Sequence, residues 1–206
     1  MDISSWLRSN AVTVATLVIL AALIFLSSAV FKPRFGNPQL VFDEAPIEKN
    51  SELMLSPGET YRYSYNMNGT EINISYAILD GIGCTRVRFV EKLNDSEVCL
   101  DSHGNDATGY NSTFSNPSIM LFKPWMLALK EGWTWKSSMF LSYGGDLSPV
   151  SVTDYRVIRS ESYGNRTAFV VEIKSEDNYS EYQWVDAEKR VLLKSMGQGY
   201  EVRRVD

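Results

Sequence analysis

A run of twenty-one uncharged residues, Ala11–Phe31, constrains this chain more than any other feature of its sequence. An α-helix of this length is about 31 Å long, close to the hydrocarbon thickness of a bilayer. The sequence therefore predicts a transmembrane anchor at 11–31, preceded by a short cytoplasmic tail at 1–10. Trp6 supports an anchor, because an indole ring is favoured at the boundary between lipid and water.

The alternative is a secretory signal that is removed. Ser27-Ser28-Ala29 places small residues at the spacing of a signal-peptidase site, so cleavage after Ala29 is compatible with the sequence. The apolar run is longer than the usual hydrophobic region of a signal peptide, about 7–15 residues, and this favours a retained anchor.

The flanking charges do not decide the orientation, since Arg8 precedes the run and Lys32 and Arg34 follow it. Two other signals place the C-terminal part outside the cytoplasm. Chance predicts about two N-glycosylation acceptors of the form N-x-S/T in a chain of this composition. The chain has six: Asn68, Asn73, Asn94, Asn111, Asn165 and Asn178. Cys84 and Cys99, an even pair, predict one disulfide, with two unrelated buried thiols as the alternative.

Residues 32–58 read as a proline-rich stalk, because Pro33, Pro38, Pro46 and Pro57 prevent a long helix. The apolar residues Leu40–Phe42 within it are compatible with an edge strand. The remaining residues, 59–206, are enough for one extracytoplasmic β-rich domain.

Polar and apolar residues alternate through most of this domain, which predicts strands with one buried face. Asn68-Gly69 lies between the first two strands and favours a tight hairpin turn. The predicted strands are Thr60–Tyr65, Glu71–Asp80, Thr85–Val90, Glu97–Asp101, Trp133–Tyr143, Val150–Ser160, Thr167–Lys174, Tyr179–Val185, Arg190–Met196 and Tyr200–Val205. Their short connections predict an antiparallel meander.

One segment does not alternate. Asn116-Pro117 is a suitable helix start, and the following residues are apolar on nearly every side, so this helix needs cover all round. Pro124 is expected to kink it. The predicted fold is mainly β (α+β): a curved antiparallel meander, or half-barrel, wrapped around one short kinked helix. A mobile lid and an exposed docking surface are the other interpretations of this segment.

Three stretches resemble the half-barrel fold of the lipoprotein-carrier proteins and related domains of unknown function. They are Leu55–Tyr63, the pair Leu121–Pro124 and Glu131–Trp135, and the closing hairpin Tyr182–Asp186 with Val191–Lys194. The turn of that hairpin, Ala187–Arg190, contains no glycine. The resemblance implies an extracytoplasmic domain whose concave face holds an acyl chain or an apolar peptide. It therefore nominates a ligand or partner surface: Phe122, Trp125, Met126, Trp133 and Trp135.

No catalytic motif is evident, so we expect no enzyme activity, no metal and no cofactor. His103 is the single histidine and is interpreted as a loop residue. Tyr61, Tyr63 and Tyr65 share one strand face, which packs in the core or lines a groove. The net charge of −5 and the absence of a basic run argue against nucleic acid.

The sequence thus predicts a non-enzymatic, membrane-anchored glycoprotein that binds a protein partner or an apolar ligand at the cell surface. An archaeal surface or a eukaryotic secretory compartment suits it, and the resemblance to a prokaryotic fold favours the former. The alternative is a non-catalytic subunit of a membrane complex, such as secretion or glycan-transfer machinery. An enzyme whose acidic residues converge only in the fold is a third hypothesis.

Overall fold

The computed structural model describes residues 39–43, 46–48, 51–91, 94–107, 121–143, 146–176 and 179–205. The chain divides into two compact units, and the larger comprises Leu40–Leu141 and Leu147–Asp206. The predicted tail and anchor at 1–31 lie outside the described residues. Within the described ranges, no helix has the length and apolar character needed to cross a membrane.

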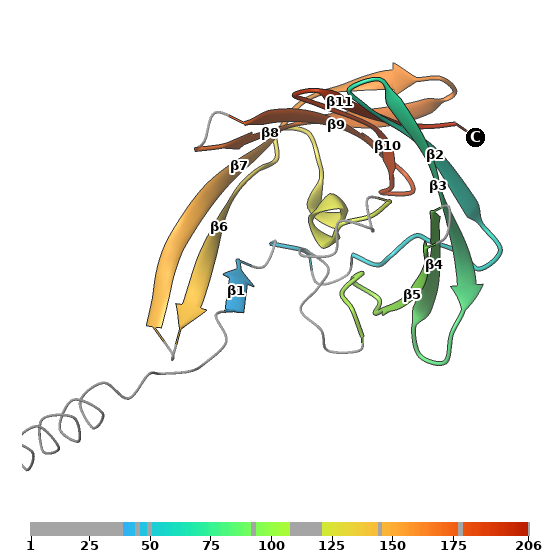
Figure 1. Ribbon diagram of the computed structural model, residues 1–206, viewed down its shortest axis with the longest axis horizontal. Coiled ribbons are helices and arrows are strands. Elements are labelled where there is room, and N and C mark those ends of the chain that lie inside the picture. The colour runs from blue at the N-terminus through green and yellow to red at the C-terminus, as the bar shows by residue number, and fades with distance from the viewer. Residues whose placement is uncertain are drawn as a thin grey trace, which may run out of the picture. The chain divides into compact units, whose positions relative to one another are not determined.

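The strands form a single curved sheet in the order β1-β6-β7-β8-β9-β10-β11-β2-β3-β4-β5 (Figure 1). Their bounds are β1 Gln39–Phe42, β2 Thr60–Met67, β3 Thr70–Asp80, β4 Thr85–Glu91, β5 Asn94–Leu100, β6 Thr134–Tyr143, β7 Asp146–Tyr163, β8 Arg166–Ser175, β9 Ser180–Asp186, β10 Leu192–Gly197 and β11 Tyr200–Arg204. Two meanders, β2–β5 and β6–β11, join through antiparallel pairing of β11 with β2. The predicted antiparallel, curved sheet is confirmed.

The alternating segments form strands because each buries one face against the core. Asn68 and Gly69 have φ angles of 51° and 84°, which define a type I′ turn, and Met67 pairs with Thr70 across it. The predicted hairpin is therefore confirmed. β1 lies at one edge of the sheet beside β6, so Leu40–Phe42 does form part of an edge strand.

The disulfide is also confirmed. Cys84, just before β4, is bonded to Cys99 in β5, with 5.6 Å between the two Cα atoms. The bond joins the two strands of the hairpin that forms the sheet's other edge.

The apolar segment contains a short 3-10 helix, η1, at Pro124–Ala128. The predicted helix start at 116 lies outside the described residues. Pro124 occupies the first helical turn and Lys123 before it is extended, with φ −134° and ψ 143°. Proline therefore begins the described helix instead of kinking it, because its ring excludes the residue before it from helical angles and it needs no N–H at a first turn.

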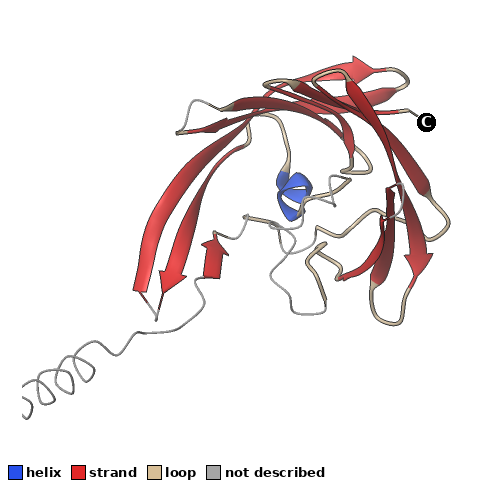
Figure 2. Cartoon of the chain, in the orientation of Figure 1, coloured by secondary structure: helices blue, strands red, loops and turns tan. Residues whose placement is uncertain are grey.

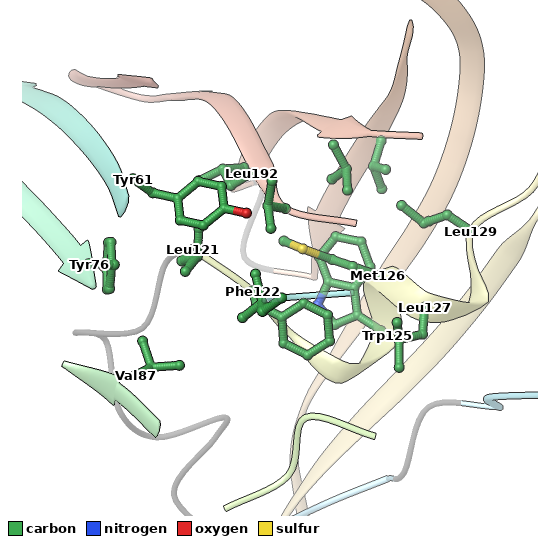
Figure 3. Close-up of a cluster of buried hydrophobic side chains, with 14 of the residues drawn as sticks. Tyr61, Tyr76, Val87, Leu121, Phe122, Trp125, Met126, Leu127, Leu129 and Leu192 are labelled. Atoms are coloured by element: carbon green, nitrogen blue, oxygen red, sulfur yellow. The ribbon is translucent and has the colours of Figure 1, made fainter. Parts of the chain in front are cut away.

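The segment Leu121–Leu129, which we call the plug, lies on the concave side of the sheet (Figure 2). Its side chains point into the core, among them Leu121, Phe122, Trp125 and Met126, all 0–2% exposed (Figure 3). The helix has no polar face, so the curved sheet that surrounds it satisfies the expected need for cover.

Two hydrogen bonds from β10 and the turn before it hold the ends of the plug. The Leu192 amide donates to the Leu121 carbonyl at 2.8 Å, beside a register shift between Leu192 and Lys194. The Arg190 guanidinium donates to the Leu129 carbonyl at 2.9 Å.

Arg190 also explains the glycine-free turn. Its φ is 58°, a left-handed conformation that costs a non-glycine residue roughly 1–2 kcal/mol. The Asp186 carboxylate accepts the amides of Glu188 and Lys189 and stabilises the turn. The arginine side chain lies 5.0 Å from the centroid of the Phe169 ring, so it ties the turn to the core in a way that glycine could not.

Candidate functional site

The structure brings three of the five residues nominated as a ligand or partner surface together, since the Trp133 ring lies 6.2 Å from that of Trp125 and 6.3 Å from that of Trp135, but it buries most of the five. Phe122, Trp125, Met126 and Trp133 are buried, between 1% and 7% exposed, and Trp135 is partly buried. Trp135 stacks on Tyr155 of β7 with 4.9 Å between ring centroids. These two rings lead from the core to a polar region of the concave face.

Glu181 of β9 is the centre of that region. Its carboxylate accepts hydrogen bonds from the Ser195 hydroxyl at 2.6 Å, the Gln183 amide at 2.6 Å and the Tyr179 hydroxyl at 3.0 Å. Tyr179 and Tyr200 are joined through their hydroxyls at 2.7 Å. We call Lys123, Tyr155, Tyr179, Glu181, Gln183, Ser195 and Tyr200 the Glu181 cluster.

The backbone explains why these side chains meet. Glu181 and Gln183 alternate along β9 and so share its concave face, and Tyr179, just before the strand, continues the alternation. Tyr200 faces Gly197 directly across the β10–β11 pair, and its ring covers the glycine, where a Cβ would clash with it. This placement aims the Tyr200 hydroxyl at the cluster.

The charges of the cluster are coupled. Burial lowers the pKa of Lys123 to about 8, while the Glu181 carboxylate acts in the opposite direction. Burial and the same carboxylate raise the pKa of Tyr155 to about 12, and they also raise that of Tyr200. Lys123 and Glu181 are therefore opposite charges of one cluster, and both side chains are partly buried.

The Ser195 hydroxyl and the Gln183 amide both donate to the same Glu181 oxygen, Oε1, at 2.6 Å each. The buried Gln183 Oε1 has no hydrogen-bond partner within the described part of the chain. Sequence analysis did not single out Lys123 or Glu181, although the alternation Tyr179, Glu181, Gln183 was a usable signal.

The tyrosines of β2 divide between core and rim. Tyr61 and Tyr63 are 3% and 0% exposed, and the Tyr63 hydroxyl donates to the Leu192 carbonyl. Tyr65 is only partly buried and lies 6.1 Å from Tyr200 between ring centroids. Tyr61 and Tyr63 therefore pack in the core, and Tyr65 extends the aromatic surface beside the Glu181 cluster.

The sheet's outer face carries an open depression of about 450 Å³ over β6, β7 and β8. Its charged side chains pair with one another: Lys136 with Asp154 at 3.2 Å, and Glu172 with Arg156 at 2.7 Å and Lys174 at 2.9 Å. The hydrogen bond from Lys174, with those from Arg156 and Tyr182, outweighs burial and lowers the pKa of Glu172. The pair of Lys136 with Asp154 is well exposed, whereas the Glu172 side chain is only 10% exposed beneath its two cationic partners.

The glycosylation acceptors with described side chains are exposed. Asn68 lies in the β2–β3 turn, Asn73 on the outer face of β3 opposite Ser64, and Asn165 in the β7–β8 turn. Asn94 begins β5, and the predicted acceptors Asn111 and Asn178 lie outside the described residues.

His103 is half-buried in the loop after β5, with its Nδ1 at 3.3 Å from the Ser102 hydroxyl. Over the residues that the structure describes, no group of three or more His, Cys, Asp or Glu side chains is placed to hold a metal ion.

No family model matches the chain, and no curated protein matches it. Two solved structures show limited likeness. One is a protein from Bacteroides fragilis, described as exported and as having a YmcC-like fold; identity is 12%, coverage is 73% of this chain and 97% of the other, and the TM-score is 0.35. The other is a DUF1329 family protein from Desulfovibrio piger, with 10% identity, coverage of 70% and 67%, and a TM-score of 0.23. TM-scores this low do not establish a shared fold.

Proposed function

We propose that this chain is a non-enzymatic, membrane-anchored, N-glycosylated extracytoplasmic protein that binds a protein partner through the Glu181 side of its concave face. The disulfide supports an oxidising compartment, because such bonds rarely persist in a reducing cytoplasm. The exposed acceptors Asn68, Asn73 and Asn165 are compatible with glycans that leave the concave face open.

The observation that carries the proposal is the plug. Leu121, Phe122 and Met126 fill the concave face with the chain's own side chains, in the place where a lipid carrier would hold an acyl chain. This favours a protein partner over an apolar ligand. Beside the plug, Trp135, Tyr155, Tyr179 and Tyr200 remain partly exposed around two charges. Tyrosine and tryptophan next to a charged pair are typical of the residues that dominate protein interfaces.

The test is recovery of partners from native membranes. The full chain with an affinity tag is cross-linked, extracted in mild detergent and purified, and co-eluting proteins are identified by mass spectrometry. We expect a specific partner with the wild type, and at least tenfold less with Trp135→Ala, the loss that removal of an interface hot spot produces. Lys136→Ala is the matched control, because it changes the next residue on the other face of β6.

Two outcomes would contradict the proposal. Equal recovery with Trp135→Ala and Lys136→Ala would exclude the concave face. Recovery of no protein above an untagged control, with bound lipid found by native mass spectrometry, would favour an apolar ligand. Migration on blue-native electrophoresis distinguishes a transient partner from a stable membrane complex.

A further inference from the structure

β7 is much longer than the strand beside it. It has 18 residues against 10 in β8, and their pairing begins only at Thr153 with Ser175. One further bond, from the Glu176 amide to the Val152 carbonyl at 3.3 Å, extends the contact. Within the described ranges, no strand pairs with Leu147–Ser151 on the β8 side. We call Leu147–Ser151 the overhang.

Strand alternation determines which backbone groups the overhang presents. The Val157 amide donates to the Trp133 carbonyl, toward β6, whereas the Val152 carbonyl faces β8. Alternate residues of a strand direct their N–H and C=O to opposite sides, so Ser148 and Val150 direct both groups toward the open side. Pro149 faces β6, and its missing N–H therefore does not protect the open edge.

The side chains of the overhang also lack the usual protection of an edge. Leu147 is 58% exposed and Val150 is 51% exposed. The sequence from Ser137 to Thr153 contains no lysine or arginine, and its single charge is Asp146. Soluble proteins normally block exposed edges with lysine, proline or a bulge, because an open edge is a template for another strand.

We infer that this open edge pairs antiparallel with the same edge of a second copy of this chain, about a two-fold axis at Ser148, so that Leu147 lies opposite Pro149 and Val150 lies opposite Asp146 of the second copy. Glu176 already lies opposite Val152, so only a short strand fits beside the overhang. The matching edge of a second copy is equally short, because its own Glu176 lies opposite its Val152 in the same way. Centring on Ser148 keeps each overhang clear of the other copy's Glu176. The contact is isologous, and it rests on edge geometry rather than on the proposed function.

Disulfide trapping in the full chain tests the pairing. Directly opposed, hydrogen-bonded residues lie about 5.5 Å apart, within the range of a disulfide. Under mild oxidation of native membranes, we expect Ser148→Cys to shift most of the chain to twice the monomer mass on non-reducing gels. Ser162→Cys, exposed at the far end of the same strand, should remain monomeric.

A second substitution separates pairing from random collision. Adding Val150→Asp to Ser148→Cys places a carboxylate directly opposite Asp146 of the second copy, and like charges at this position should abolish the cross-linked dimer, while the melting temperature of the domain changes little. The inference is overturned if Ser148→Cys cross-links no more than Ser162→Cys, or if Val150→Asp leaves the cross-linked fraction unchanged.

Discussion

Lys123 is a lysine whose surroundings disfavour its charged form. Its folded-state pKa is about 8, against 10.5 for an unhindered lysine, because burial disfavours the ammonium form. A difference of this size corresponds to about 3 kcal/mol of cost for holding the charge below pH 8. Between pH 8 and 10.5 the unfolded chain binds the extra proton, so the stability of the folded protein rises with pH in this window.

Replacing Lys123 with methionine should therefore stabilise the domain at pH 7, by up to about 3 kcal/mol. The advantage over the wild type should shrink as the pH rises from 8 to 10, because the wild-type lysine then becomes neutral. Denaturant unfolding at several pH values measures this difference. Lys130→Met is the control, since the same substitution is made there on a side chain that is 67% exposed. If the unfolding free energies of the wild type and Lys123→Met changed with pH in parallel, a buried charge at Lys123 would be contradicted.

Gly104 is required by the plug. Its φ is 79°, and a Cβ there would clash with the buried Phe122 ring. We expect Gly104→Ala to cost about 2–4 kcal/mol, from the left-handed backbone and the overpacking together. Gly58→Ala should cost only about 1 kcal/mol, because Gly58 also has a positive φ but no atom within 4 Å of the new Cβ. Equal losses of unfolding free energy would show that Phe122 does not press on this loop.

At the scale of elements, the β4–β5 hairpin depends on a covalent link. The disulfide spans a sequence separation of 15 residues, and closing such a loop stabilises a domain by about 3 kcal/mol, chiefly by restricting the unfolded chain. The double variant Cys84→Ala/Cys99→Ala should therefore lose about 3 kcal/mol in denaturant unfolding. Reduced wild type should match it. Labelling of two free thiols in native material would contradict the bond.

The elements also show which local patterns determine structure. β2 and β3 were predictable because their alternation and the Asn68-Gly69 turn are both local. The predicted strand at 190–196 begins later, at Leu192, because Arg190 takes a left-handed conformation that its contact with Leu129 stabilises. That contact joins residues 61 positions apart, so the local alternation of polar and apolar residues cannot reveal it.

For the whole molecule, the glycosylation acceptors test the compartment. Glycopeptide mass spectrometry of native material should find glycans at Asn68, Asn73 and Asn165, whose side chains are exposed. Asn165→Gln should remove one glycan and change the unfolding free energy by less than about 0.5 kcal/mol, since the residue lies in a surface turn. Three unmodified asparagines would contradict residence in a glycosylating compartment.

The order of residues alone determined the strands, the disulfide and the need to cover an apolar segment, because each depends on neighbours in the chain or on the cost of exposing apolar side chains to water. The Glu181 cluster and the overhang were decided only by tertiary structure. Lys123 and Glu181 interact although they are 58 positions apart in the sequence. The overhang exists because the pairing of β7 with β8 covers only part of β7. The assembled sheet decides where each strand ends relative to its neighbours, because pairing between distant segments outweighs the local preference of a residue for a strand.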